Sequence, residues 1–175
     1  MSQTPATCIM TLPGVMFRRG FWLYVWRVQT AEDGELLYVG RTGDNSSPNA
    51  VAPYTRMGQH LGFQKTQNAL RKHLAAKGLK PEDCIAFHLV AHGPIHAEIE
   101  GDKSTPEARS ALMPAHTKPR DAIAAIEKAL ADDLAAAGYA VMNTVRCNAP
   151  LDLTAYTPVC VAFAEHFERL CKGSA

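Results

Sequence analysis

The chain of 175 residues lacks the features that mark several classes of protein. No apolar run approaches the roughly 20 residues that cross a bilayer. The N-terminus lacks the basic, apolar and small-residue order of a signal peptide. Hydrophobic residues make up 47% of the chain and charged residues 20%, which is typical of a globular protein and excludes a disordered or collagen-like one. We therefore expect a soluble, cytoplasmic domain.

Cysteine is sparse and scattered, and no C-x-x-C pair occurs, which argues against a zinc ribbon or a thioredoxin-like site. The cysteines are Cys8, Cys84, Cys147, Cys160 and Cys171. Reduced thiols are the expectation for such a set in the cytosol.

A net charge of +1 does not by itself indicate a nucleic-acid partner. The distribution is more informative, because no acidic residue lies between Asp44 and Glu82. The cations of this segment are Arg56, Lys65, Arg71, Lys72, Lys77 and Lys80. They could attract a polyanion, or they could form an ordinary solvated helix face.

Residue patterns predict a small α/β or α+β domain. Residues 21–29 (FWLYVWRVQ) and 36–41 (LLYVGR) are typical of strands, and Asp33-Gly34 between them is typical of a hairpin turn. A third strand is expected over 84–91, and a short extended segment over 139–145.

Four helices are expected, over 54–61, 64–77, 117–137 and 158–172. Pro119 would lie in the first turn of the third helix, and Thr157 would cap the fourth. Residues 92–116 are expected to form a long loop or insertion, with at most a short helix near 106–112. One domain over 1–175 is expected, with its core at about 21–144 and a C-terminal helical extension over 150–175.

Several polar residues fit the needs of phosphodiester cleavage, which are an oriented water, a cation for the phosphoryl oxygens and a metal ion. Tyr24 and Tyr38 lie on the two strands of the hairpin and could bind a phosphate or a water. Arg56 and His60 are four residues apart on a helix and share a face. Each feature alone is also explained by ordinary packing or by an exposed basic helix.

Glu127 lies on or near the apolar stripe of the third helix, which is formed by Ile123, Ile126, Leu130 and Leu134. A carboxylate there is costly unless it is paired or binds a metal. Asp133 lies near the opposite margin of the stripe, so helical geometry does not decide between the two carboxylates. One carboxylate with waters is an acceptable Mg²⁺ site.

Taken in order, these residues form a known pattern. The hairpin contains Trp22-Leu23-Tyr24 and then Tyr38-Val39-Gly40-Arg41-Thr42, and the next helix carries Arg56-Met57-Gly58-Gln59-His60. Glu127 and Asn143 follow on and after the later helix. This ordered set resembles the GIY-YIG nuclease family over most of the chain, and it departs from the family in having Trp22 where the first motif has glycine.

The resemblance implies a central, mostly antiparallel sheet flanked by helices and a metal-dependent DNA endonuclease. Tyr24 and Tyr38 would orient or deprotonate the water, while Arg56 would stabilise phosphoryl charge and His60 would assist as a base or phosphate ligand. Glu127 would hold a divalent cation, Mg²⁺ or Mn²⁺. The supporting residues would be Gly40 and Asn143, and the DNA contacts would come from Arg41, Lys65, Arg71 and Lys72.

Other interpretations stay open. The same fold could serve as a non-catalytic nucleic-acid-binding module, or an unrelated small α/β domain could act through protein contacts. In the second case Tyr24, Tyr38, Arg56 and Glu127 would not converge in space. A zinc site at His88, His92 and His96, or a thiol nucleophile at Cys84 beside His88, is a further, less supported alternative.

Overall fold

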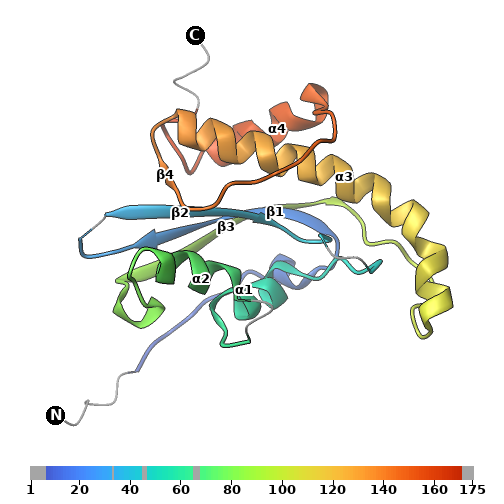
Figure 1. Cartoon of the computed structure of the whole chain (residues 1–175), viewed down its shortest axis with the longest axis horizontal. Helices are drawn as coiled ribbons and strands as arrows, with labels where there is room; N and C mark the ends of the chain where they lie inside the picture. Colours follow the sequence, from blue (N-terminus) through green and yellow to red (C-terminus); the bar gives the residue numbers. More distant parts are fainter. Residues whose placement is uncertain (1–6, 33, 45–46, 65–67, 171–175) are drawn as a thin grey trace.

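The computed structural model describes residues 7–32, 34–44, 47–64 and 68–170. One four-stranded sheet with the order β3-β1-β2-β4 lies at the centre. Helices α1 and α2 cover one face of this sheet, and α3 and α4 cover the other (Figure 1). All pairings are antiparallel except that of β2 with β4. The expected fold class, an α+β domain with a mostly antiparallel sheet, is confirmed.

The hairpin consists of β1 (Phe21–Gln29) and β2 (Glu35–Arg41). Its turn closes where the Thr30 amide donates to the Gly34 carbonyl over 2.8 Å. Asp33, which was expected in this turn, lies outside the described residues. Because side chains alternate along a strand, the even-numbered residues of both strands face α1 and α2, whereas the odd-numbered ones face α3 and α4.

Strand β3 (Ala86–His96) is longer than expected, and the prediction that a loop begins at His92 was wrong. The strand continues through Gly93. Near this glycine its register against β1 shifts between Phe21 and Leu23, as in a β-bulge. A Cβ at Gly93 would lie 2.9 Å from the ring of Trp22, so this glycine accommodates the bulky residue at that position. Strand β4 (Ala140–Val141) is short and parallel to β2.

Helix α3 (Pro106–Ala136) is far longer than expected, and the placement of Pro119 in its first turn was wrong. Pro114 and Pro119 both lie inside the helix. A proline inside a helix removes one backbone hydrogen bond, but α3 continues through both residues. His116 is fully buried, and its Nε2 lies 3.2 Å from the Gly43 carbonyl. Thr105 is the N-cap of the helix, and its hydroxyl accepts from the Ala108 amide.

Helix α4 (Leu153–Ala164) begins earlier than expected, and the prediction that Thr157 caps it was wrong. Asp152 is the cap, because its carboxylate accepts from the amides of Thr154 and Ala155. The Thr157 hydroxyl instead donates to the Leu153 carbonyl inside the helix. Val159 and Phe163 of this helix are buried, as are Phe167 and Leu170 in the segment that follows it.

Helix α1 (Pro53–Leu61) ends at Leu61 as expected, and α2 (Ala69–Ala76) buries Leu70 and Leu74. Two short 3₁₀ helices, η1 (Gly14–Phe17) and η2 (Pro81–Asp83), complete the described elements. The segment expected to be extended over 139–145 contains only the two residues of β4 as strand.

Each face of the sheet has its own core. The larger core joins odd-numbered strand residues to α3 and α4, including Leu23, Val39, Leu130 and Phe163. The C-terminal helical extension is therefore part of the main core. The smaller core lies under α1 and α2. Within the described part of the chain, no helix is both long and apolar enough to cross a membrane.

Candidate active site

The two hairpin tyrosines lie on the face of the sheet that α1 and α2 cover. Tyr24 is 1% exposed and Tyr38 is 9% exposed. In the ladder Tyr24 lies opposite Gly40, and Tyr38 lies opposite Trp26. A Cβ at Gly40 would lie 2.5–2.7 Å from ring carbons and the hydroxyl of Tyr24. Gly40 is therefore more than a strand-end glycine, because it leaves the space in which the phenol end of Tyr24 lies.

His60 connects α1 to both tyrosines. Its Nε2 lies 2.6 Å from the Tyr24 hydroxyl, and its ring centroid lies 5.1 Å from that of Tyr38. The Tyr24 hydroxyl also donates to the Arg41 carbonyl over 3.2 Å. Both contacts of the Tyr24 hydroxyl are satisfied if it donates to the Arg41 carbonyl and accepts the Nε2 proton of His60. The Nδ1 atom of His60 then has no hydrogen-bond partner among the described residues.

Burial controls the charge of these groups. It lowers the pKa of His60 to about 4, with a further contribution from the Arg56 charge, so the imidazole is neutral near pH 7. Burial raises the pKa of Tyr24 well above its usual value and that of Tyr38 to about 12. For Tyr38 the Glu127 carboxylate adds to this rise. Both phenols are therefore protonated in the resting protein.

Arg56 extends from α1 toward the same end of the sheet. Its guanidinium forms an ion pair with Asp44, donates to Gln59 over 3.3 Å and lies 3.5 Å from the Arg41 carbonyl. The charge of Arg56 lowers the pKa of Tyr24 and of Tyr38 against the effect of burial. It would thus stabilise negative charge that develops beside either tyrosine.

Glu127 comes from the opposite layer of the molecule. It lies on α3, is 7% exposed, and forms an ion pair with Arg41 at the end of β2. Burial raises the pKa of Glu127 to about 7 in spite of the lowering effect of Arg41. Asp133, the other carboxylate of this helix that the sequence left open, is exposed and accepts a hydrogen bond from Tyr156. The structure thus brings Glu127, and not Asp133, to the site.

Asn143 holds the strand that carries Tyr38 and Gly40. The Val39 amide donates to Oδ1 of Asn143 over 2.9 Å, and Nδ2 of Asn143 donates to the Val39 carbonyl over 2.8 Å. Because β4 ends at Val141, this side chain takes the place of a further strand residue along β2. Asn143 therefore joins the segment after β4 to the middle of β2.

The structure therefore brings together the residues that the sequence singled out as candidate catalytic and metal ligands. The Arg41 carbonyl accepts from the Tyr24 hydroxyl and lies 3.5 Å from the Arg56 guanidinium, while the Arg41 guanidinium pairs with Glu127. Tyr38 joins the cluster through the ring of His60, at 5.1 Å between centroids. The interpretation as an unrelated domain required that the two tyrosines, Arg56 and Glu127 lie apart, which is not the case. Of the proposed DNA contacts, Arg41 also belongs to this cluster.

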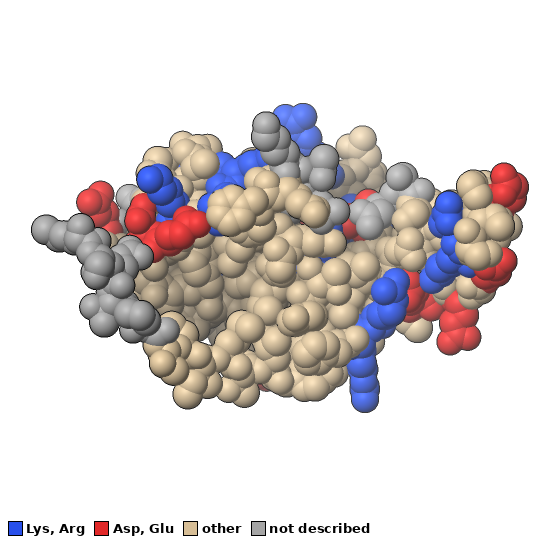
Figure 2. Space-filling model, turned by 90° about the horizontal axis from the view of Figure 1, so that it is seen from below, with Lys and Arg blue, Asp and Glu red and all other residues tan. Residues whose placement is uncertain are grey.

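The remaining proposed DNA contacts lie elsewhere. Arg71 forms an ion pair with Glu82 and stacks on the Phe63 ring at 4.2 Å. Lys72 is exposed on α2, and Lys65 lies outside the described residues. Figure 2 shows that the surface seen from below is mostly uncharged, with basic and acidic residues mixed toward its margins. A continuous basic track is not visible on this face.

Two residues of the cluster were missed by sequence analysis. Asp44 neutralises Arg56, and the ring of His73 lies 5.4 Å from that of Tyr38. Asp44 lies in a loop and His73 lies on a short helix beyond the residues of the motif. No spacing rule connects either residue to the strands, so only the folded chain reveals the contacts.

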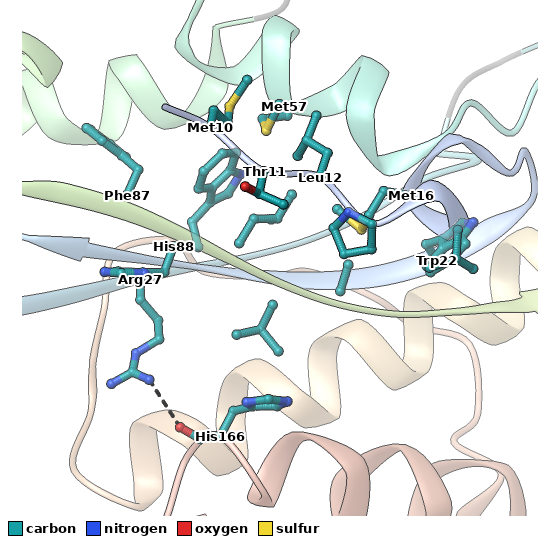
Figure 3. A pocket seen from close by; sticks show the side chains of 16 residues that line it. Met10, Thr11, Leu12, Met16, Trp22, Arg27, Met57, Phe87, His88 and His166 are labelled. Atoms are coloured by element: carbon teal, nitrogen blue, oxygen red, sulfur yellow. Dashed lines mark hydrogen bonds between the residues drawn. The ribbon is translucent and has the colours of Figure 1, made fainter. Parts of the chain in front are cut away.

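A cavity of about 590 Å³ lies apart from the cluster, along β3 and the N-terminal segment (Figure 3). Met10, Met57 and Phe87 border it, while Arg27 points toward His166 and donates to its carbonyl. None of the candidate catalytic residues lines this cavity. The candidate site is therefore not part of this cavity.

The alternative sites gain no support from the geometry. His92 and His96 contact the rings of Phe163 and Phe21, respectively, and His88 is exposed. No group of three or more His, Cys, Asp or Glu side chains gathers in a metal-binding arrangement among residues 7–32, 34–44, 47–64 and 68–170.

Comparisons of the chain with protein-family models, curated proteins and solved structures found no match. The functional argument therefore rests on the motif residues and on their arrangement in space.

Proposed function

We propose that the protein is a metal-dependent endonuclease that hydrolyses DNA phosphodiester bonds, in the manner of the GIY-YIG nucleases that it resembles. One observation carries the proposal: motif residues from β1, β2, α1 and α3 meet at one end of the sheet. The proposed reaction adds a water oxygen to phosphorus and breaks one ester P–O bond.

The two tyrosines differ in what they can contact. Tyr24 is the more deeply buried, and its hydroxyl is engaged by His60 and by the Arg41 carbonyl. Tyr38 is more exposed. Glu127 is the second-largest cause of its raised pKa, and burial is the largest. We therefore assign the orientation of the attacking water to Tyr38. Tyr24 and His60 would act behind it, as a buried pair that fixes the geometry and can accept a proton.

Arg56 has the geometry of a phosphate ligand, because a guanidinium presents a fork of donors that matches phosphoryl oxygens. It would bind the scissile phosphate and stabilise the charge that builds up during attack. Asp44 holds Arg56 in place in the resting protein. Approach of the phosphate would make Arg56 exchange this exposed partner for the substrate.

The residues at the site fit a Mg²⁺ or Mn²⁺ ion. Glu127 is a buried carboxylate whose raised pKa shows that Arg41 does not fully offset the cost of its charge. Mg²⁺ keeps several waters and commonly uses one or two carboxylates together with substrate phosphate. Glu127 would hold the ion, which would supply charge stabilisation at the phosphoryl and leaving oxygens.

The exposed cation of Lys72 would add non-specific affinity for the DNA backbone. A cytoplasmic location fits the free thiols of Cys8, Cys84 and Cys147. We therefore propose DNA in the cytoplasm as the partner.

Incubation of the purified protein with supercoiled plasmid and with branched or single-stranded DNA tests this proposal. Parallel reactions contain Mg²⁺, Mn²⁺ or EDTA. Glu127→Gln is the test variant, and Asp133→Asn on the same helix is the matched control. We expect metal-dependent nicking that Glu127→Gln abolishes and Asp133→Asn retains. Salt-dependent DNA binding without cleavage of any substrate would instead indicate the non-catalytic binding module.

A further inference from the structure

Two arginines of the site are each paired with a carboxylate, but they are not held equally. Arg56 contacts Asp44, Gln59 and the Arg41 carbonyl. The Arg41 guanidinium makes one hydrogen bond, to Glu127, in the described part of the chain. The buried Nε of both arginines lacks a hydrogen-bond partner there, so the difference lies in the number of partners of the terminal nitrogens. Arg41 is therefore the less firmly anchored of the two cations.

The carboxylate that Arg41 contacts is the one that would bind the metal. The side chains of Arg41 and Glu127 are only 18% and 10% exposed, respectively, so little water screens charges between them. A guanidinium and a divalent cation at the same buried carboxylate repel each other strongly. Metal binding to Glu127 and the Arg41–Glu127 ion pair are thus competing states of one site.

We propose that Arg41 is a metal-released phosphate ligand, which neutralises Glu127 in the metal-free protein and turns to the DNA backbone when a divalent cation takes its place. The inference rests on the proposed function and deepens it. Arg41 follows Gly40 on the strand of Tyr38, and its charge acts on Tyr38. Once released, its fork of donors lies at the end of the sheet where the phosphate must enter.

This arrangement couples two binding events. The metal frees a cation for the phosphate, and the phosphate stabilises the position of Arg41 in which Glu127 is available to the metal. Because the coupling is reciprocal, each ligand raises the affinity for the other by the same factor. DNA would therefore be held weakly until the site is loaded with metal.

The first arm of the test measures Mn²⁺ binding without DNA, by calorimetry. Arg41→Met removes the competing cation, so we expect it to bind Mn²⁺ about tenfold more tightly than the wild type does. Arg71→Met is the matched control, since Arg71 pairs with Glu82 away from the site, and it should bind Mn²⁺ like the wild type. Equal Mn²⁺ affinity in Arg41→Met and the wild type would overturn the proposal.

The second arm measures binding of a short DNA duplex by fluorescence anisotropy, in EDTA and in Ca²⁺. For the wild type and Arg71→Met we expect Ca²⁺ to tighten binding about tenfold. Arg41→Met should lose this gain. Glu127→Gln should bind in EDTA about as tightly as the wild type does in Ca²⁺, because its Arg41 is permanently released. Retention of the full Ca²⁺ gain by Arg41→Met would overturn the proposal.

The two arms separate this inference from the proposed function. Tighter Mn²⁺ binding by Arg41→Met, with no DNA binding by any protein, would support the competition but overturn both the phosphate ligand and the DNA substrate. DNA cleavage by the wild type, with Arg41→Met unchanged in both arms, would overturn the inference alone. Thermal unfolding of Arg41→Met shows whether this variant folds. The double variant Arg41→Met/Glu127→Gln buries no unpaired charge, so a recovery of its unfolding temperature would assign any loss in Arg41→Met to the unpaired Glu127 carboxylate.

Discussion

The two faces of the central sheet bury different kinds of side chain. The face under α3 and α4 is apolar along the strands, with Leu23, Val25 and Val39 packed on the helices. The face under α1 and α2 buries Tyr24, Tyr38 and His60. Because successive strand residues point to opposite faces, one hairpin supplies both a core and a candidate active site.

The comparison also shows how the two layers are connected. Glu127 is the candidate site residue that comes from the α3 layer, and its ion pair with Arg41 joins that layer to the end of β2. Mutations on the strands should therefore affect either stability or cleavage, depending on the face. Glu127 is the exception, because it lies on α3 and belongs to the candidate site. The following predictions test this separation.

The largest effect on stability is expected from a cavity in the apolar face. Leu130 is fully buried in the larger core, so Leu130→Ala should lower the free energy of unfolding by about 2–5 kcal/mol. Urea denaturation measures this loss. DNA cleavage at a temperature where the variant is folded should stay near that of the wild type. A large loss of cleavage in the folded variant would contradict the separation of the faces.

The polar face should instead give a pH dependence of stability. The pKa of His60 is about 4 in the folded protein and 6.5 as the unperturbed value. Between these values the unfolded chain binds a proton that the folded chain does not, so stability is lost as pH falls from 6.5 to about 4. The loss from this residue is on the order of 2–4 kcal/mol.

His60→Gln removes this contribution while it keeps a polar side chain. Denaturation across the window, in EDTA, should show that the stability of the wild type relative to the variant falls as the pH falls. The pKa of Glu127 is raised to about 7, so its contribution to stability is lost as the pH rises. Because both proteins contain Glu127, its contribution cancels in the difference between them. A constant difference between the two proteins would show that His60 is not held neutral by burial.

A smaller effect is expected from the glycine under Tyr24. Gly40→Ala places a methyl group against the Tyr24 ring and should destabilise the protein by about 1–3 kcal/mol. Cleavage should fall as well, because the Tyr24 hydroxyl is displaced from His60. Gly58→Ala in α1 is the control, because a Cβ added at Gly58 would meet nothing within 4 Å. This substitution should stabilise the helix by about 0.5–1 kcal/mol. Unchanged cleavage in Gly40→Ala would refute the packing argument.

The smallest effect is expected at the exposed cation of α2. Lys72→Ala should leave stability within about 0.5 kcal/mol of the wild type. It should weaken DNA binding a few-fold and reduce the dependence of log Kd on log salt by about 1. Binding titrations at several salt concentrations measure both quantities. An unchanged salt dependence would remove Lys72 from the DNA-contacting surface.

The sequence was informative where local patterns are strong. Aromatic and β-branched residues on either side of a turn located β1 and β2, and the three-and-four spacing of Ile123, Ile126 and Leu130 located the buried face of α3. The motif order selected residues that the fold brings together. These features depend on near neighbours in the chain, which is why sequence reasoning succeeds there.

Element boundaries depended on contacts that the sequence does not show. Residues 92–116 were expected to form a loop and Pro119 to lie in the first turn of a helix, but α3 runs through both Pro114 and Pro119. His116 between them is buried, and its Nε2 lies near the Gly43 carbonyl. The partners Asp44 and Glu127 could not be assigned to their arginines, because each pair forms only when a loop or α3 meets the sheet. The charge state of the site is therefore a property of the fold.

A pair of matched tyrosine variants tests the central claim most directly. Tyr38 and Tyr156 are similarly buried, at 9% and 7% exposed, but they lie in different layers, and Tyr156 donates to Asp133. With Mg²⁺ and supercoiled plasmid, Tyr38→Phe should lose cleavage by about a hundredfold or more while its unfolding free energy barely changes. Tyr156→Phe should keep full cleavage and lose about 0.5–1.5 kcal/mol of stability. Equal cleavage by both variants would contradict the assignment of the chemistry to the tyrosine face of the sheet.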